Sequence, residues 1–340
     1  MNRLHLRHPE LHDASPSGPP HRAKPAWRTW GVRIVTLVFF AGVVALLAHM
    51  MRTLDWATVV GTLRAYRPGT LLIAAALAAA SYAVYAGFEL AARRYSGHTL
   101  PVKLVALVGG IAYAFNLNLG AWLGGIGFRY RLYSQLGLDT ATTARLYLST
   151  LATNWTGYLA LAGVVFTLYG LDLPPQWRLS DEGLRWVGLL LVTAAAAYLV
   201  ACARARRRQW TIRGHEFELP DFRLAVVQMA LGVANWMLMA AVVYTLLPHS
   251  SQAPGYGAVL ATMLLACIAG VATHIPAGLG VLEAVFLTLL GHRVPHAQLL
   301  GALLAYRAVY YLGPLIVAGV AYAVLESRVK RRGKQTVTEA

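Results

Sequence analysis

Long runs of apolar residues constrain this chain most, because about 20 such residues in helical form cross the roughly 30 Å hydrocarbon core of a bilayer. Hydrophobic residues make up 57% of the sequence and charged residues only 13%. We therefore expect an all-α integral membrane protein, folded as a multi-pass helical bundle. Six runs are read as full spans, at 31–51, 70–92, 144–169, 184–203, 222–247 and 297–325, and further apolar runs occur at 101–118 and 256–274.

The formal charge of +16 comes from basic residues that cluster at the ends of the apolar runs. We interpret these clusters as cytoplasmic topology signals, so no nucleic-acid partner is expected. The loops at 170–184 and 248–256 lack such clusters and are expected outside. The predicted layout is a mobile cytoplasmic tail at 1–30, a membrane domain at 31–325 and a basic cytoplasmic tail at 326–340, in the inner membrane of a bacterium.

Counting the crossings leaves two regions that must begin and end on one side of the membrane. Region 101–143 returns to the cytoplasm, and region 256–296 returns to the outside. Each has an apolar arm, a glycine-rich break and a short second arm, and the arm at 281–291 would measure about 16 Å as a helix. We expect two opposed re-entrant helical hairpins with tips inside the protein, because lipid cannot satisfy irregular backbone.

The two breaks resemble each other. Gly125 and Gly127 recur as Gly278 and Gly280 at an offset of 153 residues, with Pro276 just before the second pair. Because one hairpin would enter from each side, the sequence predicts an inverted repeat with a binding site near the midplane. Chance Gly-x-Gly matches in a glycine-rich membrane chain are the alternative.

Ionisable side chains inside apolar segments are candidate site residues. Inserting a charged side chain at the centre of a membrane helix costs about 2.5 to 3.5 kcal/mol, so such residues usually have a partner and often a function. Arg129 and Glu283 would project from equivalent half-helices, so we expect an ion pair that either locks the halves or helps to bind a substrate. Arg131 would leave spare positive charge at the first break for a phosphate. The predicted substrate-binding set is Arg129, Arg131, Glu283, Arg307, Asn116, Asn118 and Tyr310.

Other features have simpler interpretations. Glu89 and Arg93, four residues apart, are read as a local helix pair. Residues 55–69 are expected to form an amphipathic helix on the outer surface. We find no nucleotide-binding, zinc-binding or catalytic-triad motif, so no cofactor, metal site or catalytic residue is predicted.

The stretches AYAFNLNLGAWLGGIGFRYRLYSQLGL, HIPAGLGVLEAVF and LLAYRAVYYLGPL resemble the YbhN-type bacterial inner-membrane proteins. These belong with the flippase-like membrane domain of lysylphosphatidylglycerol synthases, also called multiple peptide resistance factors. The resemblance runs from about residue 30 to 328 and implies a phospholipid-handling domain whose polar core is Arg129, Glu283 and Arg307. The synthases carry a soluble aminoacyltransferase domain after the membrane part; since this chain stops within fifteen residues of the last span, no enzyme activity is expected.

The leading hypothesis is a transporter or flippase for an anionic phospholipid. A non-transporting partner or regulator of a phospholipid-synthesising enzyme is the alternative. An intramembrane enzyme using Glu283 and His274 is the least favoured hypothesis, because no nucleophile or metal set accompanies them. The sequence leaves the lipid species and the oligomeric state open.

Overall fold

The structure is a computed structural model in which the chain divides into two compact units, Met1–Gly42 and Val43–Ala340. All described residues belong to the second unit. The predicted tail at 1–30 and first span at 31–51 therefore lie outside the described residues. The structure describes residues 56–170, 180–205, 209–212, 215–249, 253–273 and 280–338.

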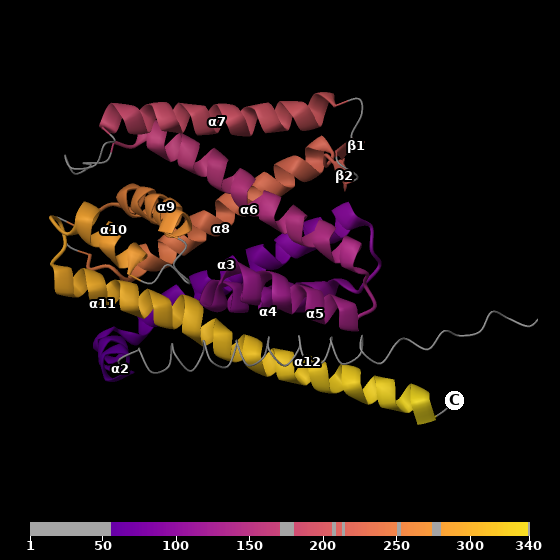
Figure 1. Ribbon diagram of the computed structural model, residues 1–340. Helices are drawn as coiled ribbons and strands as arrows, with labels where there is room; N and C mark the ends of the chain where they lie inside the picture. Colours follow the sequence, from indigo (N-terminus) through magenta and orange to yellow (C-terminus); the bar gives the residue numbers. More distant parts are fainter. Residues whose placement is uncertain are drawn as a thin grey trace, which may run out of the picture. The chain divides into compact units, whose positions relative to one another are not determined.

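The described part of the chain is helical apart from one short β-hairpin (Figure 1). Seven of its helical stretches are long and apolar enough to cross a membrane, which confirms the predicted all-α, multi-pass class. Five stretches coincide with predicted spans: α3 (Pro68–Ser96), α6 (Thr140–Leu168), α7 (Asp181–Arg204), α8 (Phe222–Leu246), and a continuous run of α11 (His296–Tyr306), η3 (Arg307–Leu312) and α12 (Gly313–Thr338).

The first predicted hairpin region folds back on itself. α4 (Val102–Gly120) is followed by the π-helical segment η1 (Ala121–Gly127) and by α5 (Phe128–Gln135). The chain reverses at Gly120, whose φ of 80° favours glycine. Across the reversal, the rings of Phe115 and Phe128 stack with centroids 3.9 Å apart.

The position of the first break corrects the sequence prediction. Gly125 and Gly127 are helical residues of η1, and Gly127 has a φ of −57°. The glycines in η1 serve close packing instead: a Cβ on Gly124 would overlap the backbone of Phe115, and one on Gly125 would meet the side chain of Asn116. The chain therefore folds back within region 101–143, but the turn lies earlier than expected.

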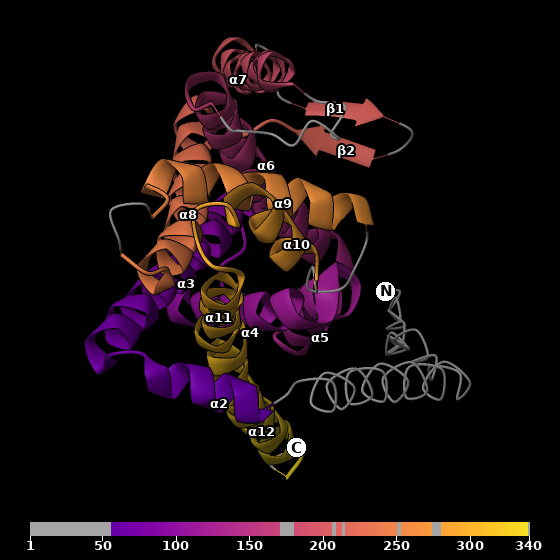
Figure 2. The same ribbon diagram turned by 90° about the vertical axis from the view of Figure 1, so that its left-hand side faces the viewer.

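The second predicted hairpin region consists of α9 (Tyr256–Thr273) and α10 (Val281–Leu290), which pack side by side (Figures 1 and 2). Gly280, a predicted break residue, caps the start of α10 with a φ of 79°. The other two, Pro276 and Gly278, lie outside the described residues, as does His274.

The two hairpins enter the bundle from opposite ends. In Figure 1 the linkers before α4 and after α5 lie at the right end, whereas α9 begins and α10 ends at the left. Two hydrogen bonds mark these two ends of the bundle. At the end where α3 leads to α4, the Tyr95 hydroxyl donates to the Glu218 carbonyl before α8. At the end where α8 leads to α9, the Tyr66 hydroxyl donates to the Leu246 carbonyl. The re-entrant placement in a bilayer and the inverted repeat stay predictions.

Small residues let the long helices approach closely. α6 crosses α8 at Gly157 and Gly232, and α6 meets α7 at Gly163 and Gly188; a Cβ at any of these would overlap the neighbouring helix. This is the usual basis of packing between helices in lipid, where hydrophobic burial gives little preference for contact.

Three shorter features complete the described chain. α2 (Trp56–Ala65) confirms a helix within the predicted amphipathic segment. The strands β1 (Gln209–Ile212) and β2 (His215–Glu218) pair antiparallel between α7 and α8, and the sequence patterns do not predict them.

The start of α6 is capped by Asp139, whose carboxylate accepts hydrogen bonds from the Thr142 amide and hydroxyl. These bonds hold the pKa of the Asp139 carboxyl below its ordinary value.

Candidate functional site

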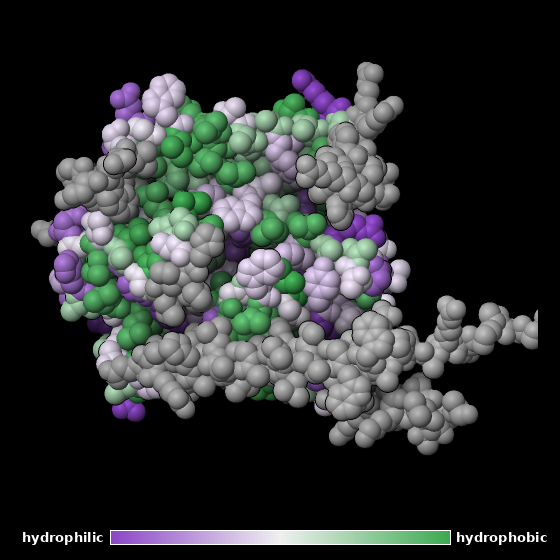
Figure 3. All heavy atoms as spheres, in the orientation of Figure 1, coloured by the Kyte–Doolittle hydropathy of each residue, from purple (hydrophilic) through white to green (hydrophobic). Residues whose placement is uncertain are grey.

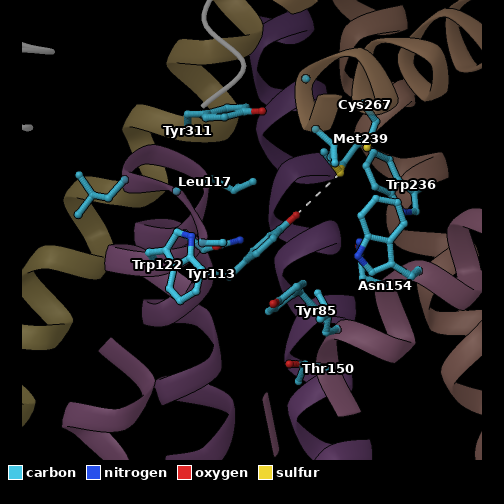
Figure 4. Close-up of a pocket in the computed structure, with 18 of the residues that line it drawn as sticks. Tyr85, Tyr113, Leu117, Trp122, Thr150, Asn154, Trp236, Met239, Cys267 and Tyr311 are labelled. Atoms are coloured by element: carbon cyan, nitrogen blue, oxygen red, sulfur yellow. Dashed lines mark hydrogen bonds between the residues drawn. The ribbon is translucent and has the colours of Figure 1, made fainter. Parts of the chain in front are cut away.

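A cavity of about 700 Å³ lies where the tips of both hairpins meet α6 and α8. The first hairpin contributes residues 116, 117 and 119–123, around its turn, and the second contributes residues from the C-terminal half of α9 and the start of α10. Figure 4 shows the labelled side chains arranged around this space, with Tyr113 and Trp122 opposite Trp236 and Cys267. The predicted junction of the two hairpins is therefore also the site of this cavity.

The mouth of the cavity opens on the outer surface of the bundle. Figure 3 shows this face hollowed near its centre, between α6 and α9 on one side and α4 and α5 on the other. Three apolar lining residues are exposed here: Trp122 at 83%, Val271 at 50% and Leu151 at 39%. Exposed apolar side chains on the spans of a membrane protein are expected to contact acyl chains. The rim of the mouth is therefore apolar.

A buried ion pair forms part of the cavity wall. Arg129 lines the cavity and is 1% exposed, and its Nη2 lies 2.7 Å from Oε1 of Glu89, which is fully buried. Arg129 Nε donates to the same oxygen at 2.8 Å, Nη1 to the Gly125 carbonyl at 2.9 Å and Nη2 to the Tyr85 hydroxyl at 2.9 Å. The Tyr133 hydroxyl donates to Glu89 Oε2 at 3.0 Å. The pair is thus fixed by hydrogen bonds on both partners.

This geometry corrects two sequence interpretations. Arg129 pairs with Glu89 and not with Glu283, because the first hairpin packs against α3 and places α5 beside the buried face of that helix. Glu89 pairs with Arg129 and not with its predicted partner Arg93, whose Nε donates to the Leu100 carbonyl. Gly109 of α4 leaves the space that the Glu89 side chain occupies, since a Cβ there would overlap it.

Glu283 forms a second ion pair, with Arg307. The Arg307 Nε lies 2.6 Å from Glu283 Oε1, and its Nη2 donates to Oε2 at 3.1 Å, so the contact is bidentate. Glu283 Oε2 also accepts the Gly280 amide at 3.0 Å, which ties the pair to the start of α10. Arg307 is 8% exposed, which confirms its predicted interior position. The pair lies behind the cavity wall, next to the lining residues Leu282 and Tyr311.

Arg131 lies away from the cavity. Its Nη2 donates to Glu326 Oε1 at 2.8 Å and its Nε to the Tyr322 hydroxyl at 2.7 Å, so it ties α5 to α12. Each of the three predicted arginines thus faces a carboxylate. The expected surplus of positive charge at the first break is therefore wrong, because Glu89 and Glu326 balance the two arginines there.

The remaining predicted residues divide between the wall and the layer behind it. Asn116 lines the cavity. Asn118 is buried behind it and donates to the carbonyls of Ala114 and Tyr311. The Tyr310 hydroxyl lies 2.9 Å from that of Tyr113, a lining residue. The predicted set leaves out most of the wall, which includes Tyr85, Tyr113, Tyr147, Thr150, Asn154, Trp155 and Trp236.

Fold and site together define a multi-pass helical membrane protein with an aromatic-lined cavity between two helical hairpins. Residues 33–318 match the family model of the lysylphosphatidylglycerol synthase TM region, and the chain belongs to this family. The match confirms the resemblance inferred from the sequence. The chain is also similar over most of its length to two curated proteins. It is 43% identical to inner membrane protein YbhN of Escherichia coli K12 over 311 residues, which cover 91% of this chain and 96% of the relative. It is 30% identical to the uncharacterized protein slr0712 of Synechocystis over 285 residues, which cover 82% of this chain and 87% of the relative.

Proposed function

We propose that this protein moves an anionic phospholipid between the leaflets of a bacterial inner membrane, with both termini cytoplasmic and without chemistry on the lipid. The observation that carries the proposal is the cavity at the meeting point of the two hairpin tips, with Arg129 in its wall. Family membership adds support, because the family is named for the membrane region of a synthase that acts on a phospholipid.

The chemistry of the cavity suits a lipid that keeps its acyl chains in the bilayer. The exposed apolar rim of Trp122, Leu151 and Val271 can contact acyl chains. Further in, Asn116 and Asn154 supply polar groups for a headgroup among aromatic rings. Rings that are apolar in body and polar at the edge accommodate both parts of a crossing lipid. Broken helices that meet inside a bundle are also how many transporters build their substrate site.

Filling the cavity should slow lipid movement. Gly270 lines the cavity, and a Cβ placed on it meets nothing within 4 Å, so Gly270→Trp puts an indole into open space. We expect the initial rate of flipping of fluorescent phosphatidylglycerol to fall about tenfold, equivalent to about 1.4 kcal/mol of barrier. The measurement is leaflet-resolved quenching in vesicles that contain the purified protein.

Gly110→Trp is the matched control. Gly110 also lies in an apolar helix with nothing within 4 Å of an added Cβ, but it does not line the cavity, so its variant should flip lipid at the unaltered rate. Equal rates for all three proteins would show that lipid does not pass through the cavity. No flipping by the unaltered protein at any protein density would remove the transport proposal itself.

A non-transporting membrane partner of a phospholipid-synthesising enzyme is the second candidate. The observation that favours it is the family name, which describes the membrane region of a synthase. Co-purification separates the two candidates, because a partner protein should be retained in a fixed ratio by a subunit that moves no lipid. A transporter should flip lipid alone.

A further inference from the structure

The charge of the cavity wall limits how an anion can bind there. Among the described residues that line the cavity, Arg129 is the one with a formal charge at neutral pH, and Glu89 neutralises it. A phosphodiester headgroup adds one negative charge to this neutral pair. If Glu89 stayed ionised, the buried site would therefore hold one uncompensated negative charge.

The groups that face Glu89 do not supply the missing positive charge. On its own helix are Tyr85, which contacts Arg129, and Arg93, which points to the Leu100 carbonyl. α4 presents Gly109, which has no side chain, and α5 presents Arg129 and Tyr133. Of these described neighbours, Arg129 is the one cation in contact with the carboxylate. A second anion would share it.

His98, in the linker after α3, also does not compensate a second negative charge. Burial and the nearby Arg93 lower the pKa of the His98 imidazole below its ordinary value, so the ring is neutral at pH 7. An uncompensated ion at a buried site costs several kcal/mol, and proteins avoid this cost by neutralising the group. Glu89 is the group that can be neutralised, because a carboxylate accepts a proton and an arginine does not release one.

We propose that an anionic headgroup binds at Arg129 together with one proton, which is taken up by Glu89. This inference rests on the proposed function and supplies its coupling ion. A phosphate oxygen replaces Glu89 Oε1 as the acceptor of the Arg129 N–H groups. The released carboxylate takes one proton from water and gives it back when the headgroup leaves and the ion pair forms again. Movement of an anionic lipid is thereby coupled to movement of a proton.

Tyr133 fits both states of Glu89. Its hydroxyl donates to the carboxylate in the ion pair, and a hydroxyl can rotate to accept a hydrogen bond from a protonated carboxyl group. Glu89 Oε2 therefore has a partner before and after the exchange. We assign Tyr133 as a positioning residue for Glu89.

The test measures binding and proton uptake with the full chain in nanodiscs made without anionic lipid. Short-chain phosphatidylglycerol is the probe, because its phosphodiester keeps one negative charge across pH 5.5 to 8. We expect one proton taken up per lipid bound and an affinity that rises as the pH falls, by up to about tenfold for each pH unit. Short-chain phosphatidylcholine brings its own positive charge, so its binding should take up no proton.

Two variants assign the proton to Glu89. Glu89→Gln removes the carboxyl group to which we assign the proton, and phosphatidylglycerol binding by this variant should become independent of pH. Glu326→Gln is the matched control, because it removes another arginine-paired carboxylate that lies outside the cavity, and it should keep the native pH dependence. If Glu89→Gln does not fold, the proton count on the unaltered protein still decides whether lipid binding is coupled to proton uptake.

The outcomes separate this inference from the proposed function. Phosphatidylglycerol that binds and flips at a rate independent of pH, with no proton taken up, overturns proton coupling and leaves lipid transport standing. A pH dependence that persists in Glu89→Gln overturns the assignment to Glu89. Failure of the unaltered protein to bind or flip either lipid overturns both proposals.

Discussion

Arg129→Ala is expected to lower the free energy of unfolding by about 3–5 kcal/mol, because it leaves the fully buried Glu89 carboxylate without its cation. The substitution also removes a hydrogen bond to the Gly125 carbonyl within the first hairpin and one to the Tyr85 hydroxyl that holds the hairpin against α3. Reversible unfolding of the purified protein in mixed detergent and dodecyl sulfate micelles measures this free energy.

Two further variants separate the loss of charge balance from the loss of packing. The double variant Arg129→Gln with Glu89→Gln leaves no buried charge and should recover more than half of the stability that Arg129→Ala loses. Arg131→Ala should cost less, about 1 kcal/mol or below, because Arg131 and Glu326 are both partly exposed. A double variant as unstable as Arg129→Ala would show that packing, and not the unpaired carboxylate, causes the loss.

The sequence predicts the five described spans and the fold-back within 101–143 because both follow from one-dimensional signals. The length of an apolar run decides whether a helix can cross the bilayer, and the positions of arginines and lysines decide where the chain must return. The reversal of 101–143 follows from this count. The turn residue does not, because six glycines occur from Gly109 to Gly127, and sequence alone does not show which one adopts a positive φ.

The ion pairs are harder to predict because they depend on which helix faces meet. The apparent repeat matches Arg129 to Glu283, and a spacing of four residues matches Glu89 to Arg93. Packing of the first hairpin on α3 overrides both, and it brings together Arg129 and Glu89 from 40 residues apart. Glu89 does carry a usable signal for a buried ion pair. It lies on an apolar helix just after Tyr85 and Phe88, and an ionisable side chain within a membrane helix is expected to face the protein interior.

The aromatic wall of the cavity escapes prediction for a related reason. Tyr85, Tyr147 and Trp236 lie on apolar spans, where an aromatic side chain that packs in the core looks the same in sequence as one that lines a cavity. Trp122 is an exception in principle, since it lies between Gly120 and Gly124, where a large side chain must leave the crowded turn.

Gly124→Ala is expected to destabilise the first hairpin by about 2–3 kcal/mol, the upper part of the range for overpacked sites. An added Cβ would overlap the carbonyl of Phe115 and the amide of Asn116, and backbone atoms cannot rotate out of the way as a side chain can. The arms must separate instead. Because Arg129 follows Gly124 by five residues, the separation should also move Arg129 away from Glu89 and impair any activity that depends on the cavity.

Gly110→Ala is the control for this prediction, since Gly110 lies in α4 with nothing within 4 Å of an added Cβ. Alanine forms helices better than glycine, so this variant should keep or slightly gain stability. Unfolding in mixed micelles measures both variants, and crosslinking of cysteines at positions 115 and 128, whose rings now stack, reports on closure of the arms. Efficient crosslinking and native stability in Gly124→Ala would contradict the tight turn, because only a more open hairpin has room for the methyl group.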